Sequence, residues 1–530
     1  MFENLSDASG NFVQTLIESK KYWGIYLALI IVTCMSTISS RTLKDPNFEI
    51  VAFIIVAILG IFCIVFYFMN DSDEDLYKVA FVIIICFGII SALIVPIVDV
   101  SDEMEHLTRA EITSQGILFP DWIGDEKNIT RLYNHTPDGG IVINPNVGFK
   151  TSQSHMFFFE NQEKTVFETP DDTNKINESQ MLDGSAFEQN PFYGYLPQGI
   201  GVFIAKAFDM NVIWMLWLPR IFNLVCYAVL ISIAIKKAPT LKIPLLAVAC
   251  IPISIYQAAS VSIDSMTIGL GILTVAYFIY MYKSKPGTLE VKDIGIFCMI
   301  SLLLGLCKLP YLAFVFLILL VPKENFKRSD SLKFIILGIL FVSAAGLLWS
   351  HYATPTLMHS WRSRQNMNST LQMRYMMSHP FSIMEFFKKI FTYEIIMIPK
   401  GLFNFFGASS QKHYTDNYVL ITVLLCIYLA ITLLFYPNKT KFNLKSRIGS
   451  LIILLMIYVG TCIIQLLTWS NIGKMFLGLS TRYFIPLFAL LPIIVPYKLD
   501  RFKDSYDRYA MVLMIGFMAT LILAFATKYY

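Results

Sequence analysis

Long apolar runs between polar stretches restrict the fold of this chain more than any other feature of its sequence. A helix needs about 20 mostly apolar residues to cross the hydrocarbon core of a bilayer, so runs of this length predict membrane spans. Hydrophobic residues make up 55% of the 530 residues and charged residues only 15%, whereas about a quarter of a typical soluble protein is charged. The sequence therefore predicts an all-α polytopic membrane protein and excludes a soluble globular enzyme. About 13 spans are expected, at residues 22–39, 48–69, 78–98, 212–235, 243–257, 266–282, 294–306, 310–322, 333–350, 418–436, 448–468, 483–497 and 510–527.

Clusters of Lys and Arg in the short loops predict the orientation of the chain, because such clusters are enriched on the cytoplasmic side of a membrane. The five clusters lie at residues 236–242, 283–292, 323–333, 439–447 and 498–508. If all five are cytoplasmic, the spans alternate without conflict and the N-terminus is cytoplasmic as well. Two long polar segments, 99–193 and 351–417, then lie outside, and the external face is expected to carry the function.

The predicted spans and loops divide the chain into four parts. These are residues 1–77, an N-terminal cytoplasmic segment with a two-span hairpin; 78–350, a core with the large first external loop 99–193; 351–417, a second external loop; and 418–530, a four-span C-terminal part. Within the core, one span kinked at Pro310 would put the basic clusters 283–292 and 323–333 on opposite sides of the membrane. Two short helices that meet near residues 305–310 keep both clusters on the same side and are therefore favoured. Broken helices are tolerated where they border a polar cavity, so Lys308 is expected to face one.

The net charge and the cysteines argue against two further classes of site. The net charge is only +4, and the basic residues lack the interleaved aromatic side chains of a nucleic-acid-binding face. No nucleic-acid partner is therefore expected. The 9 cysteines lie in or beside apolar runs without a CxxC pair, which is typical of small core residues rather than of disulfides or metal ligands.

A charged segment directly after the third span is the strongest candidate for chemistry. On a helix that starts near Ser101, the i, i+3, i+4, i+7 rule brings four side chains to one face: Asp102, Glu105, His106 and Arg109. A carboxylate at the membrane boundary beside a His and an Arg suits proton abstraction, because partial desolvation raises its basicity. The alternative is a Ser or Asp N-cap followed by a solvated charged turn.

The same segment resembles the D-E-x-x-H-x-x-R-A opening of the bacterial membrane-protein family called domain of unknown function 2142. Five later stretches are similar to that family in the same order: Tyr195-Leu196-Pro197-Gln198, Arg220-Ile221-Phe222-Asn223-Leu224, Gln257-Ala258-Ala259-Ser260-Val261-Ser262-Ile263-Asp264, Lys308-Leu309-Pro310-Tyr311 and Arg482-Tyr483-Phe484-Ile485-Pro486. Together these stretches cover about residues 78–497. The family is related to the GT-C glycosyltransferases, membrane enzymes that use polyprenyl-phosphate sugars, so the resemblance implies a GT-C-like helical bundle in a bacterial cytoplasmic membrane.

The resemblance also implies roles for individual residues. The catalytic residues would be Asp102, Glu103 and His106, with Asp102 as the base and Glu103 as its nearest substitute. The donor phosphate would be bound by Arg482, Lys308, Arg220 and Arg109, and the pocket would also include Gln257, Asp264, Tyr195, Gln198 and Tyr483. Structural alternatives exist for two of them: Arg482 could be an interfacial anchor whose charge reaches water, and Asp264 could cap the helix that follows it.

Two departures from the family pattern concern the N-terminus and the donor site. Two spans precede the core, so residues 22–69 resemble an added hairpin. The family pattern G-x-Q-G-R-Y reads Gly478-Leu479-Ser480-Thr481-Arg482-Tyr483 here. The arginine is retained and its polar neighbours differ, which leaves the basic role intact and the detail of donor recognition open.

Two further features leave alternatives open. Residues 361–365 and 386–389 combine aromatic and basic side chains, so they could lie on the lipid surface or help to close the site over the donor. A divalent metal could bind Asp102, Glu103 and His106, but no second compact ligand cluster completes a closed site. No obligatory cofactor is therefore expected.

The predicted function is that of an inverting glycosyltransferase. It would move a sugar from a polyprenyl-phosphate donor to a cell-surface glycan or glycolipid acceptor on the external face of the bacterial membrane. One alternative is a polymerase or ligase of lipid-diphosphate-linked glycans, for which Arg362 and Arg364 could bind the diphosphate. A second alternative is a non-enzymatic lipid-glycan transporter. The sequence specifies neither the sugar, the acceptor nor the oligomeric state.

Overall fold

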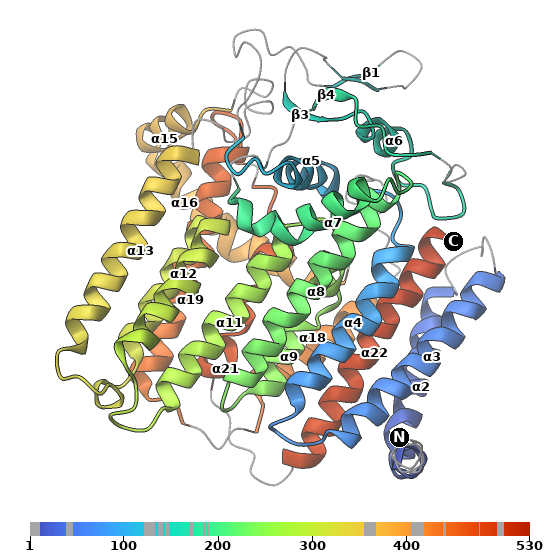
Figure 1. Cartoon of the computed structure of the whole chain (residues 1–530). Coiled ribbons are helices and arrows are strands. Elements are labelled where there is room, and N and C mark those ends of the chain that lie inside the picture. The colour runs from blue at the N-terminus through green and yellow to red at the C-terminus, as the bar shows by residue number, and fades with distance from the viewer. Residues whose placement is uncertain are drawn as a thin grey trace.

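The computed structural model is a bundle of long helices with a layer of short helices and strands over one end (Figure 1). It describes residues 11–38, 46–120, 133–135, 141–143, 148–169, 174–183, 187, 190–353, 367–403, 418–437, 441–475, 477–495 and 503–530. The helices before the second loop are α2 (Lys20–Ile38), α3 (Pro46–Met69), α4 (Leu76–Ile94), α5 (Glu103–Ser114), α6 (His155–Glu160), η2 (Phe192–Tyr195), α7 (Leu196–Ala207), α8 (Trp214–Lys237), α9 (Lys242–Ala249), α10 (Pro252–Ala258), α11 (Asp264–Lys283), α12 (Val291–Cys307), η3 (Leu309–Leu320), η4 (Lys323–Asn325) and α13 (Ser331–Ala353). The later helices are α15 (Ser369–Ser378), α16 (Pro380–Lys389), η5 (Ile390–Glu394), α17 (Ile395–Lys400), α18 (Val419–Leu434), α19 (Leu444–Trp469), η7 (Thr481–Phe484), α20 (Ile485–Phe488), α21 (Leu491–Ile494) and α22 (Lys503–Tyr529).

Among the described residues, 7 helices are long and apolar enough to cross a membrane. They are α3, α4, α8, α11, α13, α19 and α22, and each coincides with a predicted span. The most buried of them are α11 and α22, in which 94% of the apolar window lies inside the protein, whereas only 22% of that of α13 is buried. These two helices therefore lie inside the bundle, and α13 lies at its edge (Figure 1).

Of the remaining predicted spans, 22–39 coincides with the unbroken 19-residue helix α2, and the others are shorter or interrupted, so the count of about 13 full spans is not confirmed. The run 243–257 is divided into α9 and α10 at Pro252, and the run 483–497 is divided into η7, α20 and α21, with Pro486 and Pro492 at the helix starts. Proline lacks the amide proton of a regular helix and favours the first turn, which explains these breaks. The run near residues 305–310 also breaks, since α12 ends at Cys307 and the 3-10 helix η3 starts at Leu309.

Residues of four of the five predicted basic clusters make contacts at the end of the bundle opposite α5 (Figure 1). The amino group of Lys242 donates to the carbonyl oxygen of Asp73, Arg508 pairs with Asp71 at 2.8 Å, and Lys283 donates to the carbonyl oxygen of Lys441 at 3.1 Å. Their shared position agrees with the alternation that the sequence predicts. It also explains the acidic loop 71–75, whose aspartates lie among basic side chains.

Helices from the two ends of the chain pack together. α2 contacts α3 and α22, and α22 also contacts α3 and α4. α2 and α3 lie at one edge of the bundle, and α22 lies between them and α4 (Figure 1). Tyr26 of α2 lies at the centre of this group, is fully buried, and donates a 2.5 Å hydrogen bond to the carbonyl oxygen of Val56 in α3. Thr520 of α22 bonds Thr33 of α2 at 3.3 Å.

The first long loop is not purely α-helical. It contains two small antiparallel sheets, one of β1 (Tyr133–His135) and β2 (Ile141–Ile143), the other of β3 (Phe149–Ser152) and β4 (Gln180–Asp183). The bundle is consistent with the predicted all-α polytopic membrane protein, and the loop adds these two sheets, whose strands are too short to give a periodic apolar pattern. Together with α5 and α6, the sheets form the layer over one end of the bundle, and α15 lies at the same end (Figure 1).

Candidate functional site

The start of α5 brings the first candidate residue to the centre of the site. Asp102 has a left-handed backbone conformation (φ 65°, ψ 13°), which Asp tolerates better than most residues, and its side chain does not cap the helix. Instead, its carboxylate pairs with the guanidinium group of Arg482. The Asp102 side chain is 38% exposed, whereas that of Arg482 is only 3% exposed. The arginine of this ion pair is therefore buried, and its aspartate is partly accessible to solvent.

Arg482 lies between two carboxylates. Its Nε lies 2.9 Å from Oδ2 of Asp264, and its Nη1 donates a 3.1 Å hydrogen bond to the carbonyl oxygen of Ser101. Asp264 is the first residue of α11, and the N-cap position of this helix is held by Ile263. These contacts disfavour both structural alternatives, because Arg482 does not extend to water and Asp264 does not cap its helix.

Lys308 contributes a second cation to the same place. It follows the last residue of α12, and its Nζ lies 3.2 Å from the centre of the Tyr483 ring, a cation–π geometry. Lys308 also interacts electrostatically with Asp264 and Asp102. The break between α12 and η3 thus brings this lysine to a cluster of two acidic and two basic side chains.

His106 lies one turn after Asp102 and is buried. Its Nδ1 is 2.6 Å from the hydroxyl oxygen of Tyr195, and its ring stacks on Phe187 with a centroid distance of 4.1 Å. Asn190 donates to the same hydroxyl at 3.1 Å. Burial lowers the pKa of His106 to about 4 despite the nearby Asp102 carboxylate. The ring is therefore neutral at pH 7, and the Tyr195 hydroxyl can donate to its Nδ1.

The pKa of Asp102 reflects opposing effects. Burial of the carboxyl group is the largest single effect and raises its pKa, but Arg482, His106 and Ser101 together lower it more, so the net pKa lies below its usual value. Asp102 is consequently ionised at neutral pH. Its basicity is held low as long as Arg482 is its partner.

Glu103 and Arg220 form a buried ion pair away from this cluster. Nε and Nη2 of Arg220 bind the two carboxylate oxygens at 2.8 and 2.6 Å, and the remaining guanidinium protons are donated to the carbonyl oxygens of Ala92, Val95 and Pro96. The amide of Val261 also donates to Glu103, at 2.9 Å. The geometry gives this pair a structural role, since every guanidinium donor of Arg220 already has a partner within the protein.

Arg109 also points away from the cluster. It donates to the Thr113 hydroxyl at 2.8 Å and to the carbonyl oxygen of Leu118 at 3.0 Å, and its guanidinium carbon lies 5.6 Å from the centre of the Tyr195 ring. These contacts tie α5 to the chain that follows it. The structure therefore brings Asp102 and His106 to the site and leaves Arg109 outside it.

A buried amide network holds the segment that presents Asp264. The side chain of Asn223 accepts from Gln198 at 2.8 Å and from the Ser265 hydroxyl at 2.8 Å, and it donates to the carbonyl oxygen of Ser260 at 2.7 Å. Gln257 is buried next to this network, and its carbonyl oxygen accepts from the Ser260 hydroxyl at 2.8 Å. The polar motif before α11 thus shapes the loop, and its last residue reaches the site.

A second buried polar cluster, not predicted from the sequence, fixes the other end of α5. Glu111 pairs with His155 and Lys206, and His155 Nδ1 lies 3.0 Å from Asp183. Burial alone would lower the pKa of His155, but the two carboxylates outweigh burial and raise the pKa to about 9. The positive charges of His155 and Lys206 outweigh the effect of burial on Glu111 and lower its pKa to about 2. These partners come from four separate segments, so no local spacing identifies them.

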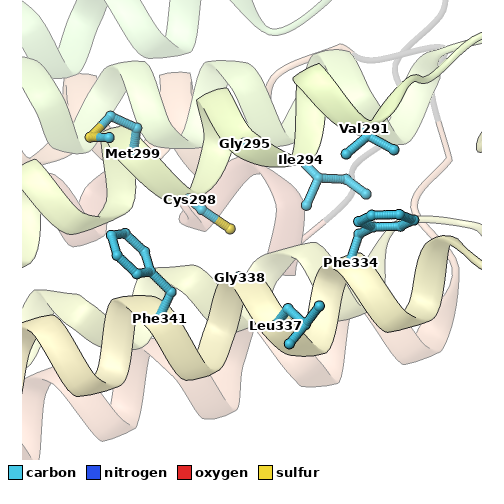
Figure 2. Close-up of a pocket in the computed structure, with 9 residues that line it drawn as sticks. All are labelled: Val291, Ile294, Gly295, Cys298, Met299, Phe334, Leu337, Gly338 and Phe341. Carbon is cyan, nitrogen blue, oxygen red and sulfur yellow. The ribbon is translucent and has the colours of Figure 1, made fainter.

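A separate cavity lies between α12 and α13. Its volume is about 340 Å³, and its lining is formed by Val291, Ile294, Gly295, Cys298, Met299, Phe334, Leu337, Gly338 and Phe341. Figure 2 shows the side chains of the two helices facing each other across it. None of the predicted site residues lines this cavity.

Two more predictions from the sequence concern a possible metal site and the pair Arg362 and Arg364. Among the described residues, no group of three or more His, Cys, Asp or Glu side chains is arranged to hold a metal ion. Segment 361–365, with Arg362 and Arg364, lies outside the described residues.

Comparison with known proteins gives one match. The model of a family described as predicted membrane protein (DUF2142) matches residues 85–491, within the range of the motifs that resemble it. No curated protein and no solved structure matches the chain.

Proposed function

The chain belongs to the predicted membrane protein family DUF2142, and we propose that it is an inverting glycosyltransferase of the GT-C type. Its donor would be a polyprenyl-phosphate sugar, and its acceptor a cell-surface glycan or glycolipid on the external face of a bacterial cytoplasmic membrane. The observation that carries this proposal is the convergence of Asp102, Asp264, Lys308 and Arg482. Two cations suit a phosphate, and a carboxylate beside them suits a base.

The charges of the cluster support a defined sequence of binding and catalysis. Without a donor, the two carboxylates balance the charges of Arg482 and Lys308. A phosphate that binds Arg482 competes with Asp102 for the guanidinium group. Asp102 then loses the interaction that lowers its pKa and becomes a stronger base. Donor binding thus activates the base.

The transfer itself needs one proton acceptor and one stabilised leaving group. Asp102 takes the proton of the acceptor hydroxyl, whose oxygen forms the new bond to the anomeric carbon of the sugar. The bond from that carbon to the phosphate oxygen breaks, and the lipid phosphate departs. Arg482 and Lys308 stabilise the negative charge that builds on the departing oxygen. Attack opposite the leaving group inverts the anomeric centre.

The test of this function is a transfer assay with a panel of donors. Purified protein in lipid vesicles is incubated with synthetic polyprenyl-phosphate sugars and a cell-envelope glycan extract, and the release of lipid phosphate is measured. We expect release from at least one donor, dependent on the acceptor. Arg482→Ala should weaken donor binding about 10- to 150-fold, as expected for the loss of about 1.5–3 kcal/mol in a charged contact. Lys445→Ala, at the opposite end of the bundle, is the matched control and should not change it.

A different result would refute the proposal. If no donor releases lipid phosphate, or if a correctly folded Arg482→Ala protein binds donor as well as the wild type, the cluster is not a donor site. Movement of an intact lipid-linked glycan across the vesicle membrane without lipid-phosphate release would favour a transporter instead.

A further inference from the structure

The second long loop contains a helical segment with an unusual distribution of side chains. α16, the π-helical turn η5 and α17 follow one another without a break from Pro380 to Lys400. The segment is not one of the helices long and apolar enough to cross a membrane. It lies beside the upper part of α19 and contacts α18 and η7.

The segment has one face that packs on the protein. Ser382, Phe386, Ile390 and Glu394, at every fourth position, are all buried. In a regular α-helix a stripe of spacing four drifts by about 40° at each step. The π-helical turn, which takes more residues per turn, offsets this drift. One face therefore stays against the bundle from Ser382 to Glu394, whereas α17 has no buried residue.

The next residues form a second face, which is apolar and uncovered. These residues are Ile383, Phe387, Phe391 and Ile395, exposed by 39%, 42%, 43% and 43%. Phe387 and Phe391 stack with a centroid distance of 6.5 Å. Met384 widens the apolar surface and is 68% exposed. Such a continuous exposed apolar surface on a helix indicates contact with lipid or with another apolar surface.

A third face is polar. Glu385 and Lys388 are exposed, and Lys389 reaches up to the carbonyl oxygen of Met475, in the loop after α19. At 100° per residue, Glu385 lies about 160° from Phe387. A helix with a protein-facing, an apolar and a polar face suits the boundary of a bilayer, where water, acyl chains and protein meet along one line.

Two contacts fix the level of the segment along the bundle. At its upper end, α15 reaches past the last residue of α19, since Gln372 donates to the carbonyl oxygen of Lys474 at 2.9 Å. Further along, the Tyr458 hydroxyl donates to the carbonyl oxygen of Ile390, at 2.5 Å. Tyr458 lies about three turns, or roughly 16 Å, before the end of α19 at Trp469. The segment thus enters the half of the bundle nearer α5 without crossing it.

We propose that α16, η5 and α17 form an interfacial element that lies in the lipid leaflet on the α5 side. Its apolar face would contact phospholipid acyl chains and its polar face the headgroup layer, where Lys388 is complementary to anionic headgroups. Lipid fits this surface better than a protein partner does, because the polar and apolar faces run side by side along α16, as water and acyl chains do at the boundary of a bilayer. The proposal does not depend on the proposed enzymatic function.

The segment also contacts the candidate site. The Thr481 hydroxyl donates a 3.1 Å hydrogen bond to the carbonyl oxygen of Ile398 in α17. Arg482 is the next residue of the chain. Through this contact, the depth of the segment in the leaflet affects the position of η7, the short helix that carries Arg482.

The test places a fluorescent probe on each of the two exposed faces. Phe387→Cys and Phe391→Cys report the apolar face, and Glu385→Cys and Lys388→Cys are matched controls on the polar face of the same segment. The native cysteines are buried or half-buried, so brief labelling favours the introduced residue, and the wild-type protein gives the background. Each labelled protein is reconstituted in vesicles of phosphatidylethanolamine and phosphatidylglycerol. Quenching by doxyl-labelled lipid and by aqueous iodide is then measured.

We expect lipid quenching to dominate by several-fold at positions 387 and 391, and iodide quenching to dominate at positions 385 and 388. Equal iodide quenching at all four positions would overturn the proposal, because the segment would then lie in water. Equal lipid quenching at all four would overturn the interfacial placement in favour of full immersion. Positions 387 and 391 protected from both quenchers would mean that another protein surface, such as a second copy, covers the face.

Discussion

Asp102 has a left-handed backbone conformation and pairs with Arg482, which also contacts Asp264. Both features affect how its role as a base can be tested. Asp102→Asn keeps the tolerance for the left-handed conformation and a hydrogen-bonding side chain, but it removes proton acceptance. If Asp102 is the base, turnover should fall by about 10²–10⁴-fold, while donor binding does not weaken. Steady-state transfer and equilibrium donor binding measure the two effects separately.

Glu103→Gln is the informative neighbour for that experiment. It breaks the buried pair with Arg220, so we expect a loss of stability of about 3–5 kcal/mol, seen as a lower unfolding temperature. Turnover per folded molecule should stay near the wild-type value. Wild-type turnover in Asp102→Asn together with a catalytic loss in folded Glu103→Gln would reverse the assignment of the base.

The partnership of Asp102 with Arg482 also predicts a pH effect. Arg482 lowers the pKa of Asp102, so the carboxylate stays ionised to a lower pH than a free aspartate does. In Arg482→Gln only His106 and Ser101 still oppose the effect of burial, so the pKa of Asp102 rises. The acidic limb of the pH profile of kcat/KM, which reports the free enzyme, should therefore move to higher pH. If the acidic limb of the profile stays at the same pH in Arg482→Gln, the group that titrates there is not Asp102.

At the scale of elements, α5 is fixed at both ends by buried ion pairs. Glu103 and Arg220 hold its first turn, and Glu111, His155 and Asp183 hold its last turns. Removing one partner of such a buried group leaves the others uncompensated. Hence the geometry of the candidate site depends on residues that do not touch it.

His155→Gln tests this anchor and its pH dependence. We expect a loss of about 3–5 kcal/mol in the stability of the layer over the bundle, measured by thermal unfolding or by limited proteolysis. Since the pKa of His155 is raised from 6.5 to about 9, its contribution is fully present below about pH 6.5 and is lost as the pH rises through about 9. The stability difference between wild type and variant should shrink over that interval. A difference independent of pH would mean that His155 is neutral in the folded protein.

The sequence predicted these elements only where the relevant pattern is local. Apolar runs predict the long helices, and the motifs around Asp264, Lys308 and Arg482 anticipate residues that meet in the structure. The prediction that four residues share one face of α5 holds only in part, because the left-handed conformation of Asp102 lies outside the helical periodicity. The partner of Arg220 lies 117 residues away, and no spacing rule relates such positions.

On the scale of the whole molecule, three helices from outside the region matched by the family form one group that packs on that region. The family match runs from residue 85 to residue 491. The helices α2, α3 and α22 lie outside this range and pack on one another. The hairpin that resembles an N-terminal addition is thus joined by the last helix of the chain. The two form one structural group.

Gly60→Ala tests how far this group contributes to stability. A Cβ at Gly60 would overlap the buried ring of Tyr26, which is rigid and cannot move aside cheaply. We expect a loss of about 1–3 kcal/mol, seen as a lower unfolding temperature. Gly24→Ala in α2 is the matched control, because a Cβ there meets nothing within 4 Å. Equal unfolding temperatures for the two variants would show that the Tyr26 contact is not tightly packed.

The sidedness of the whole bundle can be tested with two exposed positions. Asp73 lies at the end that gathers the basic clusters and Lys150 in the layer at the α5 end. In intact cells a membrane-impermeant thiol reagent should label Lys150→Cys, whereas Asp73→Cys should react only after permeabilisation. The opposite pattern would put the candidate site in the cytoplasm and exclude transfer on the external face.

The meeting of α2 and α22 has a consequence for biogenesis. About 460 residues separate the two helices in the chain, and at roughly 5–20 residues per second a ribosome needs about half a minute to a minute and a half to make them. Throughout that interval the first hairpin is already inserted, and the surface that will bury Tyr26 against α22 faces lipid or an insertion chaperone. The packing of α2 is therefore completed only after α22 has entered the membrane, and a ribosome that stalls before α22 would leave this packing unfinished.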